Sequence, residues 1–330
     1  MLNDSGPVSD VTRRRIERVA LRLRYSPNLA ARSLITRRTH TLGVLLPDLY
    51  GEFFSEVIRG IDVVAQRHGY HMLVSSSHSE QSALEAALHA MRGRVDGLIV
   101  MSPDLDQETL RSSLAACPAV VLLNCGSAAS GFDVIRIGNA AGAAAMTRHL
   151  QALGHTRVAF IRGAERNVDA DERLRGYRRA MRAAPTGHDV QWEVPGDFTE
   201  SGGYSAVETL LARQPRPTAI FAANDSMAIG ALCALRDAGV VVPDEMAVVG
   251  FDDIPIARYT SPPLTSVHVP IIQLGEQATE RLVHALTTER RASRCQTLPT
   301  TLVVRRSCGA TMHSTCGGAT CAVPTEEVRR

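Results

Sequence analysis

The sequence predicts an α/β fold of two lobes, each a doubly wound parallel sheet, behind a basic helical segment. Unbroken apolar segments alternate with amphipathic helical patterns between residues 41 and 289, as expected of parallel sheets covered on both faces. These strand candidates are more numerous than one sheet comfortably holds, which favours two lobes. Residues 1–40 carry a net charge of +6 and the remainder carries −4, so we expect a polyanionic partner at one end only.

The composition is that of an ordinary globular protein, because 45% of the 330 residues are hydrophobic and 21% are charged. No apolar segment approaches the roughly 18–20 residues of a membrane span, and the first residues lack the pattern of a secretory signal. The seven cysteines are odd in number and have no disulfide-like framework, which fits a reducing compartment. The sequence therefore predicts a cytoplasmic protein.

The first element expected is an amphipathic helix over residues 9–23, with Ser9 as its N-cap. Its apolar stripe consists of Ile16, Val19, Ala20 and Leu23. Most of its arginines lie off this stripe. Pro27 ends the segment, and a much shorter helix is expected over residues 28–35.

From residue 41 the chain alternates between strand and helix patterns. The expected strands are 41–47, 71–77, 96–102, 119–124, 158–163, 218–225 and 246–253. The expected helices are 52–69, 80–92, 140–153, 171–183, 201–213, 226–238 and 271–289. Several strands end in polar residues, namely Asp48, Asn124, Asn224–Asp225 and Asp252–Asp253. Parallel sheets bind ligands at the carboxyl ends of their strands, so these residues predict a ligand site.

The sequence does not favour an enzyme. Asp252 and Asp253 are adjacent on a strand and point to opposite faces, so they are not an acid/base pair. The chain has no glycine-rich dinucleotide fingerprint, phosphate loop or G-x-S-x-G elbow. The C-terminal set of Cys308, His313, Cys316 and Cys321 lacks the close-paired spacing of a metal site. No cofactor and no metal are expected, and the small, polar residues 309–330 are expected to be disordered.

Eight segments occur in an order and spacing that resemble a known family. They are NLAARSL, FFSEVIRGID, DGLIVMS, HLQALGHTRVAFIRG, ERLRGY, FAANDSMAIGAL, VVGFDD and PPLTSV, and the match runs from about residue 3 to about residue 308. Together they resemble the lac repressor/galactose repressor family of bacterial transcription regulators. The resemblance implies two periplasmic-binding-protein-like lobes, a homodimer, operator DNA as a partner, no membrane, and an effector site between the lobes.

The resemblance also implies boundaries. Residues 1–27 correspond to a remnant of the DNA-binding head, 28–40 to a hinge helix and linker, and 41–308 to the effector-binding core. Within this core we expect one lobe at about 41–138 and 271–297, and the other at about 139–268 and 298–308.

The segment NLAARSL is similar to the family's hinge helix. A helix of two turns is marginal alone in water, so it is expected to form only when two hinges of a dimer pack together on DNA. By resemblance, Leu34 is the apolar wedge in the minor groove. The other DNA-binding candidates are Arg32, Ser33, Arg37 and Arg38, of which the arginines can neutralise phosphates.

The family's first helix and recognition helix have no counterpart here, because residues 9–23 resemble the third helix of the head. The apolar stripe of this helix would normally pack on the missing pair, so we expect it to be exposed. A start codon assigned too far downstream is favoured over a truncated regulator. Direct base readout by this chain is not expected.

The resemblance assigns effector-binding roles within the core. Arg173 in ERLRGY corresponds to the arginine that grips the effector, Asp252 to an acceptor for effector hydroxyls, and Asn224 to another polar contact. Phe198 aligns with a stacking aromatic. Of Phe53 and Phe54 at the cleft mouth, one is expected to belong to the core, and Asp48 and Asn124 complete the candidates. Asp253 is expected to be structural, and Asp225 to be the N-cap of helix 226–238.

The preferred function is a repressor whose operator binding is controlled by a small-molecule effector, either a sugar or a related metabolite. A sugar, a sugar acid and a nucleoside all suit an arginine, an aspartate and a phenylalanine. One alternative is a transport-type sugar-binding protein, which should carry an export signal and no basic arm. The other is a headless cytoplasmic effector-binding protein without operator binding.

Overall fold

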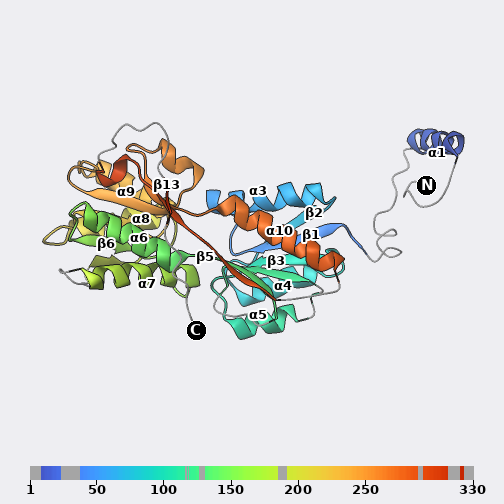
Figure 1. Ribbon diagram of the computed structural model, residues 1–330, viewed down its shortest axis with the longest axis horizontal. Helices are drawn as coiled ribbons and strands as arrows, with labels where there is room; N and C mark the ends of the chain where they lie inside the picture. Colours follow the sequence, from blue (N-terminus) through green and yellow to red (C-terminus); the bar gives the residue numbers. More distant parts are fainter. Residues whose placement is uncertain are drawn as a thin grey trace.

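The computed structural model describes residues 9–23, 38–115, 117, 119–125, 131–184, 192–288, 293–310 and 320–322. The core of the chain forms two lobes, each with a mainly parallel sheet between helices (Figure 1). The predicted fold class is confirmed, and each expected strand is present. None of the described helices is long and apolar enough to span a membrane.

The first lobe contains a wholly parallel sheet of six strands in the order β11-β5-β4-β3-β1-β2. The strands are β1 (Thr41–Leu46), β2 (His71–Ser76), β3 (Gly97–Met101), β4 (Val120–Leu123), β5 (Asp133–Ile137) and β11 (Cys295–Leu298). The helices are α3 (Glu52–Arg67), α4 (Gln81–Met91), α5 (Gln107–Leu114) and α10 (Ile271–Thr287). Alternate residues of β1 serve the two faces: Val44 packs with α3 and α10, and Leu45 with α4 and α5.

The second lobe contains a seven-stranded sheet in the order β13-β12-β10-β9-β8-β6-β7. Its parallel strands are β6 (Val158–Ile161), β7 (Glu193–Val194), β8 (Ala219–Ala222), β9 (Ala247–Asp252) and β10 (Thr265–His268). Two antiparallel strands, β12 (Thr301–Val303) and β13 (Thr320–Ala322), close one edge. The helices are α6 (Asn139–Ala152), α7 (Val168–Ala183), α8 (Glu200–Leu211) and α9 (Asp225–Asp237).

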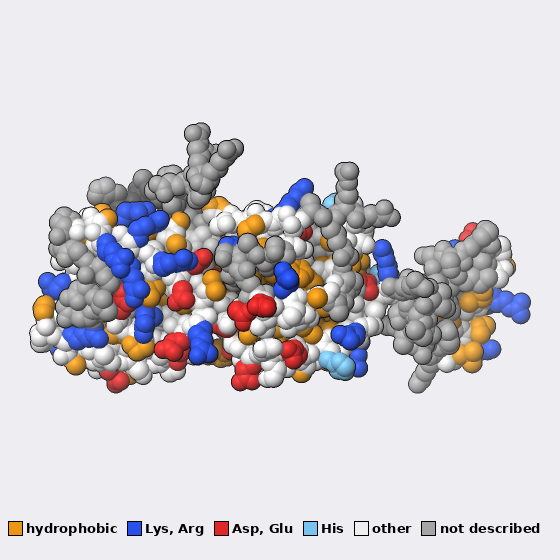
Figure 2. Space-filling view, turned by 90° about the horizontal axis from the view of Figure 1, so that it is seen from below, with side chains coloured by type: hydrophobic (Ala, Val, Ile, Leu, Met, Phe, Trp, Pro, Cys, Tyr) orange, Lys and Arg blue, Asp and Glu red, His pale blue; other side chains and the backbone are white. Residues whose placement is uncertain are grey.

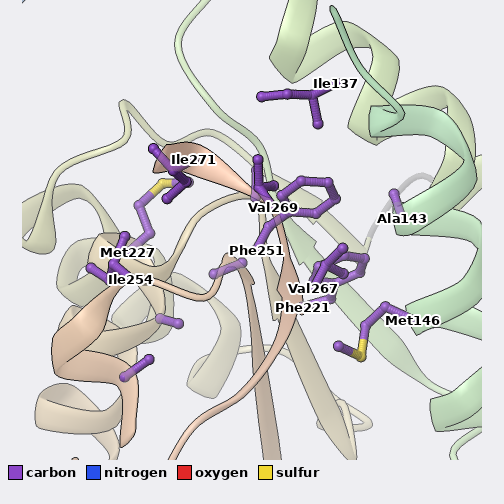
Figure 3. Packing of buried hydrophobic residues seen from close by; sticks show 14 of the residues in the cluster. Ile137, Ala143, Met146, Phe221, Met227, Phe251, Ile254, Val267, Val269 and Ile271 are labelled. Carbon is purple, nitrogen blue, oxygen red and sulfur yellow. The ribbon is translucent and has the colours of Figure 1, made fainter. Parts of the chain in front are cut away.

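The described chain passes between the lobes at three places, after β5, after β10 and after β11. Near these crossings the apolar core is continuous. Figure 3 shows Ala143 and Met146 of α6 on the same side of the sheet as Phe221 and Val267, with Ile137 of the first lobe nearby. The lobes are therefore joined through packed side chains as well as through the connecting segments.

Three helix pairs approach each other at glycines. A Cβ atom built on Gly275 of α10 would lie 2.3 Å from the carbonyl oxygen of Val57 in α3. On Gly176 of α7 it would lie 2.2 Å from the carbonyl oxygen of Ala140 in α6. On Gly230 of α9 it would lie 1.8 Å from a backbone oxygen of α8. A side chain does not fit at these three glycines, because its Cβ would clash with backbone atoms of the neighbouring helix, and backbone cannot move aside as a flexible side chain can.

The N-terminal helix α1 (Asp10–Arg22) begins at Ser9, whose hydroxyl accepts a hydrogen bond from the Thr12 amide. It stands apart from the two lobes in Figure 1. The predicted apolar stripe is exposed, since Val19 and Leu23 are 38% and 67% accessible. Figure 2 shows hydrophobic side chains beside basic ones at the end of the molecule where α1 lies. The helix therefore presents an unburied apolar face.

The expectation of disorder over residues 309–330 is wrong for Thr320–Ala322. This segment forms β13 because β12 offers an open edge, and backbone pairing needs no apolar periodicity. Cys308 is buried, and its sulfur accepts a hydrogen bond from the Thr265 hydroxyl at 3.2 Å. His313 and Cys316 lie outside the described residues.

Candidate functional site

A cavity lies between the two lobes. The first lobe lines it with the loop after β1, the start of α3 and the loop after β3. The second lobe lines it with α7, the segment before α8, the start of α9 and the end of β9. These segments follow the carboxyl ends of parallel strands, which is where such folds bind small molecules.

Arg173 reaches the cavity from α7 although only 3% of the residue is exposed. Its Nε donates to Asn139 Oδ1 at 2.9 Å, and its Nη1 donates to the carbonyl oxygen of Ala223 at 2.6 Å. Nη2 lies 2.9 Å from Oδ1 of Asp252 in an ion pair. The guanidinium carbon lies 3.9 Å from the centroid of the Phe251 ring. Contacts to several elements therefore fix the Arg173 side chain. Its guanidinium has five N–H groups, so some of them can still donate to a ligand.

Asp252 ends β9 and is 5% exposed, with a backbone φ of 107°. Burial raises the pKa of its carboxyl to about 6, although Arg173 acts in the opposite direction. Its Oδ1 is buried and lies in the ion pair with Arg173. Asp252 lines the cavity, and its carboxylate can accept a hydrogen bond from a ligand hydroxyl.

Both carboxylate oxygens of Asp253 contact side chains of the protein itself. Its Oδ1 accepts a hydrogen bond from Arg305 Nη2 at 2.6 Å, and its Oδ2 lies 3.0 Å from His268 Nδ1. The two adjacent carboxylates have separate partners, as expected of neighbours on a strand.

The N-cap of α9 is Asn224, and the prediction that Asp225 caps this helix is wrong. Asn224 Oδ1 accepts a hydrogen bond from the Met227 amide, and its Nδ2 donates to the carbonyl oxygen of Phe198, both at 2.9 Å. Both the oxygen and the nitrogen of the Asn224 side-chain amide therefore already make hydrogen bonds within the protein. Asp225 instead accepts hydrogen bonds from the Ser266 hydroxyl at 2.6 Å and the Ile254 amide at 2.8 Å. The pKa of the Asp225 carboxyl lies well above its ordinary value, mainly because the group is buried and secondly because the charge of Asp252 is near.

All three predicted aromatic residues line the cavity. Phe53 and Phe54 meet edge to face, with centroids 5.5 Å apart and an interplanar angle of 89°. Both line the cavity and both pack against the core, so each of the two rings contributes to the core as well as to the wall of the cavity. The Phe198 ring lies 5.9 Å from the Arg173 guanidinium and fills the space next to Gly163, where a Cβ would be 2.3 Å from it.

Of the weaker candidates, Asp48 lines the cavity and Asn124 is not among its lining residues. Asp48 Oδ1 accepts hydrogen bonds from the Leu49 and Tyr50 amides, which shapes the loop after β1. Asn124 is 2% exposed, and neither atom of its amide has a partner in the described part of the chain.

The sequence did not single out the residues that connect the lobes across the cavity. Asn167 Nδ2 donates to Asp104 Oδ1 at 2.9 Å, and the Val168 amide donates to the Pro103 carbonyl at 3.0 Å. Glu52 Oε2 accepts a hydrogen bond from the Ile256 amide at 2.9 Å. Asp104 follows the third predicted strand, so the strand-end signal that selected Asp48 was available for it as well. These contacts hold the lobes together at the cavity.

Of the five DNA-binding candidates, only Arg38 lies within the described residues. Its Nη2 donates to the carbonyl oxygen of Leu286, near the end of α10, at 3.3 Å. The next residues are held by Asp96, whose Oδ1 accepts from the Thr39 amide at 2.6 Å and whose Oδ2 accepts from the His40 amide at 3.0 Å. Leu34, Arg32, Ser33 and Arg37 lie outside the described residues.

Comparison with known proteins places this geometry in context. Residues 147–308 match a family model described as a periplasmic binding protein-like domain. The chain is 34% identical to the ribose operon repressor of Escherichia coli K12 over 87% of this chain and 88% of that protein. It is similar to a transcriptional regulator CelR–cellobiose complex, with a TM-score of 0.75, 31% identity and 93% coverage of both chains. A lac repressor dimer bound to operator and the anti-inducer ONPF has a TM-score of 0.83 and 29% identity, with 94% and 93% coverage.

Proposed function

Because this chain belongs to the lac repressor/galactose repressor family, we propose that its interlobe cavity holds the effector and that effector binding governs its attachment to operator DNA. The family's members are transcriptional repressors controlled by a small molecule, and this chain is one of them. The observation that carries the proposal is the buried Arg173–Asp252 pair beside aromatic rings in that cavity. A fork of guanidinium donors next to a carboxylate acceptor suits vicinal hydroxyl groups, which favours a sugar.

The way that the chain enters the first lobe supports coupling between the two functions. Thr39 and His40 are tied to Asp96, and Arg38 is tied to the end of α10. A rotation of the first lobe therefore carries the start of the linker with it. Two such linkers in a dimer, the form seen in the lac repressor complex, would be moved together or apart when the lobes close. Because a two-turn hinge helix is marginal by itself, a coupling of about 1–3 kcal/mol suffices to switch it.

A thermal-shift screen with sugars, followed by DNA binding in the presence of any compound that stabilises the protein, tests the proposal. An effector that binds only the folded state raises Tm, and the rise grows with the logarithm of the ratio of its concentration to Kd once that ratio is large. We expect the same compound to change the affinity for operator fragments selected from genomic DNA. A compound that raises Tm and leaves DNA affinity unchanged for every selected fragment contradicts the proposal.

Leu34→Ala is expected to weaken operator binding by about tenfold or more while leaving effector affinity unchanged. Without the apolar wedge the base step is no longer kinked, and the protein contacts less of the DNA. A loss of about 1.4 kcal/mol in binding free energy corresponds to a tenfold higher Kd. Fluorescence anisotropy measures operator affinity, and calorimetry measures effector affinity. Leu153→Ala, an exposed apolar position in the second lobe, is the matched control. Equal operator affinity in the Leu34 variant and its parent would remove Leu34 from the interface.

Asp104→Ala is expected to weaken effector binding by about tenfold by removing a bridge between the lobes. The variant loses the charged acceptor of the Asn167 hydrogen bond, which is worth about 1.5–3 kcal/mol. The nearby Asp106→Ala is the control, because Asp106 caps α5 within the first lobe and its loss lowers stability without touching the bridge. Calorimetry gives affinity, and urea unfolding gives stability. An Asp104 variant with parental affinity would show that this bridge does not favour the closed form.

A further inference from the structure

The interlobe cavity is strongly acidic. Among its described lining residues, Arg173 is the one cationic side chain, and it is accompanied by carboxylates. These are Asp48, Glu52, Asp104, Asp169, Asp197 and Asp252. Arg173 is paired with Asp252 and also attracts Asp169, so a single cation faces six carboxylates in the described lining. An anionic ligand would meet uncompensated negative charge there.

Most of these carboxylates are engaged in local hydrogen bonds. Asp104 accepts from the Ser79 hydroxyl at 2.7 Å as well as from Asn167. Asp197 Oδ1 accepts from the Thr199 amide at 2.9 Å and from its hydroxyl at 2.7 Å. Asp104 and Asp197 therefore fix the conformation of the cavity walls and add negative electrostatic potential to the cavity.

Asp169 differs from them. It lies in the first turn of α7, and its Oδ1 accepts a hydrogen bond from Asn139 Nδ2 at 2.7 Å. Its Oδ2 receives no hydrogen bond from the part of the chain that the structure describes. Burial raises the pKa of this carboxyl to about 7, with Arg173 and Asn139 opposing and Glu172 and Asp252 reinforcing the shift. A group of this kind gains most from a ligand that brings a positive charge.

Aromatic side chains line the same space. Tyr50, Phe53, Phe54 and Phe198 all contribute to the wall of the cavity. The face of an aromatic ring attracts an ammonium group, and more strongly where water is excluded. An aromatic wall beside a carboxylate oxygen that accepts no hydrogen bond from the described residues is suited to a protonated amine, whereas the Arg173–Asp252 pair is suited to hydroxyl groups.

We propose that the effector is a polyhydroxylated molecule carrying a protonated amine, that Asp169 binds this amine, and that the cavity rejects sugar acids and sugar phosphates. This inference rests on the proposed function, because it assumes that the interlobe cavity is the effector site. Asp169 sets the charge that is accepted, and Arg173 with Asp252 positions the hydroxyl-bearing part.

Calorimetry with matched sugars tests this assignment. The probes are the common aldohexoses, their 2-amino-2-deoxy forms and their uronic acids, each titrated into the parent protein and into Asp169→Asn. We expect one amino sugar to bind about tenfold more tightly than its neutral counterpart, the scale of one hydrogen bond between charged groups. In Asp169→Asn this preference for the amino form should vanish. Asp171→Asn, an exposed position on the same helix, should retain the preference.

The pH dependence supplies a second readout. Affinity for the amino sugar should rise above about pH 6 in the parent, because Asp169 ionises there, and fall again near about pH 8 as the amine of the ligand loses its proton. The charged and titratable groups around it are Arg173 and Glu172 of α7, Asp252 of β9 and Cys125 after β4. The dependence should be weaker in Asp169→Asn. A dependence as steep in the variant as in the parent would assign the titration to Asp252 and overturn the role of Asp169.

The outcomes separate this inference from the proposed function. If neutral sugars bind and their amino forms bind no better, the assignment of an amine to Asp169 is wrong and the effector site stands. If a uronic acid binds more tightly than both, the charge argument is wrong. If no member of the three series binds, both the inference and the proposal of a sugar-type effector fail.

Discussion

Arg173→Ala is expected to lower the free energy of unfolding by about 3–5 kcal/mol, the usual effect of leaving one member of a buried ion pair alone. Asp252 would lose its cation, and Asn139 Oδ1 and the Ala223 carbonyl would lose their donors. Urea unfolding followed by circular dichroism measures the loss. Arg173 is therefore a structural centre of the second lobe as well as a proposed ligand contact.

The loss should depend on pH. Burial already raises the pKa of Asp252 to about 6 in the presence of Arg173, and removing the guanidinium raises it further. A carboxyl with a raised folded-state pKa adds stability that is fully present below its unfolded pKa of about 4 and is lost as pH rises through the folded value. The difference between variant and parent should therefore be large above about pH 7 and small near pH 4.

Two further variants separate charge from shape. Arg173→Lys keeps the charge without the fork of donors, so it should retain part of the stability. The double variant Arg173→Met/Asp252→Asn removes both charges and should recover most of the loss, since replacing a whole buried pair is often neutral. A single Arg173→Ala variant with parental stability at about pH 8 would show that the pair adds nothing to folding.

The sequence predicted the strands that are buried on both faces. All residues of β3, β4 and β8 are buried. Strands of this kind are unbroken apolar segments, which can be recognised from the sequence alone. It did not predict β5, which contains Asp133 and Arg136, or the short polar strand β11. Those strands form because a neighbour offers an open backbone edge, and local composition carries no sign of that edge.

The candidate site was predicted in part. The ends of β1 and β9 carry Asp48 and Asp252, and both line the cavity. Asn124 had the same signal at the end of β4 but is buried and does not line the cavity, because the turn that follows a strand decides which side chain faces the cavity. Arg173 came from resemblance to a family motif and not from any local pattern. Asp169 lies four residues before it, and its importance depends on tertiary burial that spacing does not encode.

Gly230→Ala is expected to destabilise the second lobe by about 1–3 kcal/mol or more, the usual effect of overpacking. In an isolated helix the same change would add stability of up to about 1 kcal/mol, since alanine has the higher helix propensity. Here the new Cβ would lie 1.8 Å from the Glu200 carbonyl oxygen and 3.0 Å from the Tyr204 amide. Both obstacles are backbone atoms of α8, so relief requires that the two helices separate and lose packing along their whole contact.

The effect should extend to the cavity, because α8 begins shortly after Phe198 and α9 begins directly after Asn224. Moving these helices apart strains the Asn224–Phe198 hydrogen bond of 2.9 Å. We therefore expect weaker effector binding together with a lower Tm. Arg236→Ala, an exposed position on the same helix, is the control and should change stability by less than about 0.5 kcal/mol. A Gly230 variant that is more stable than its parent would mean that helix propensity outweighs the clash, and that this crossing tolerates a side chain.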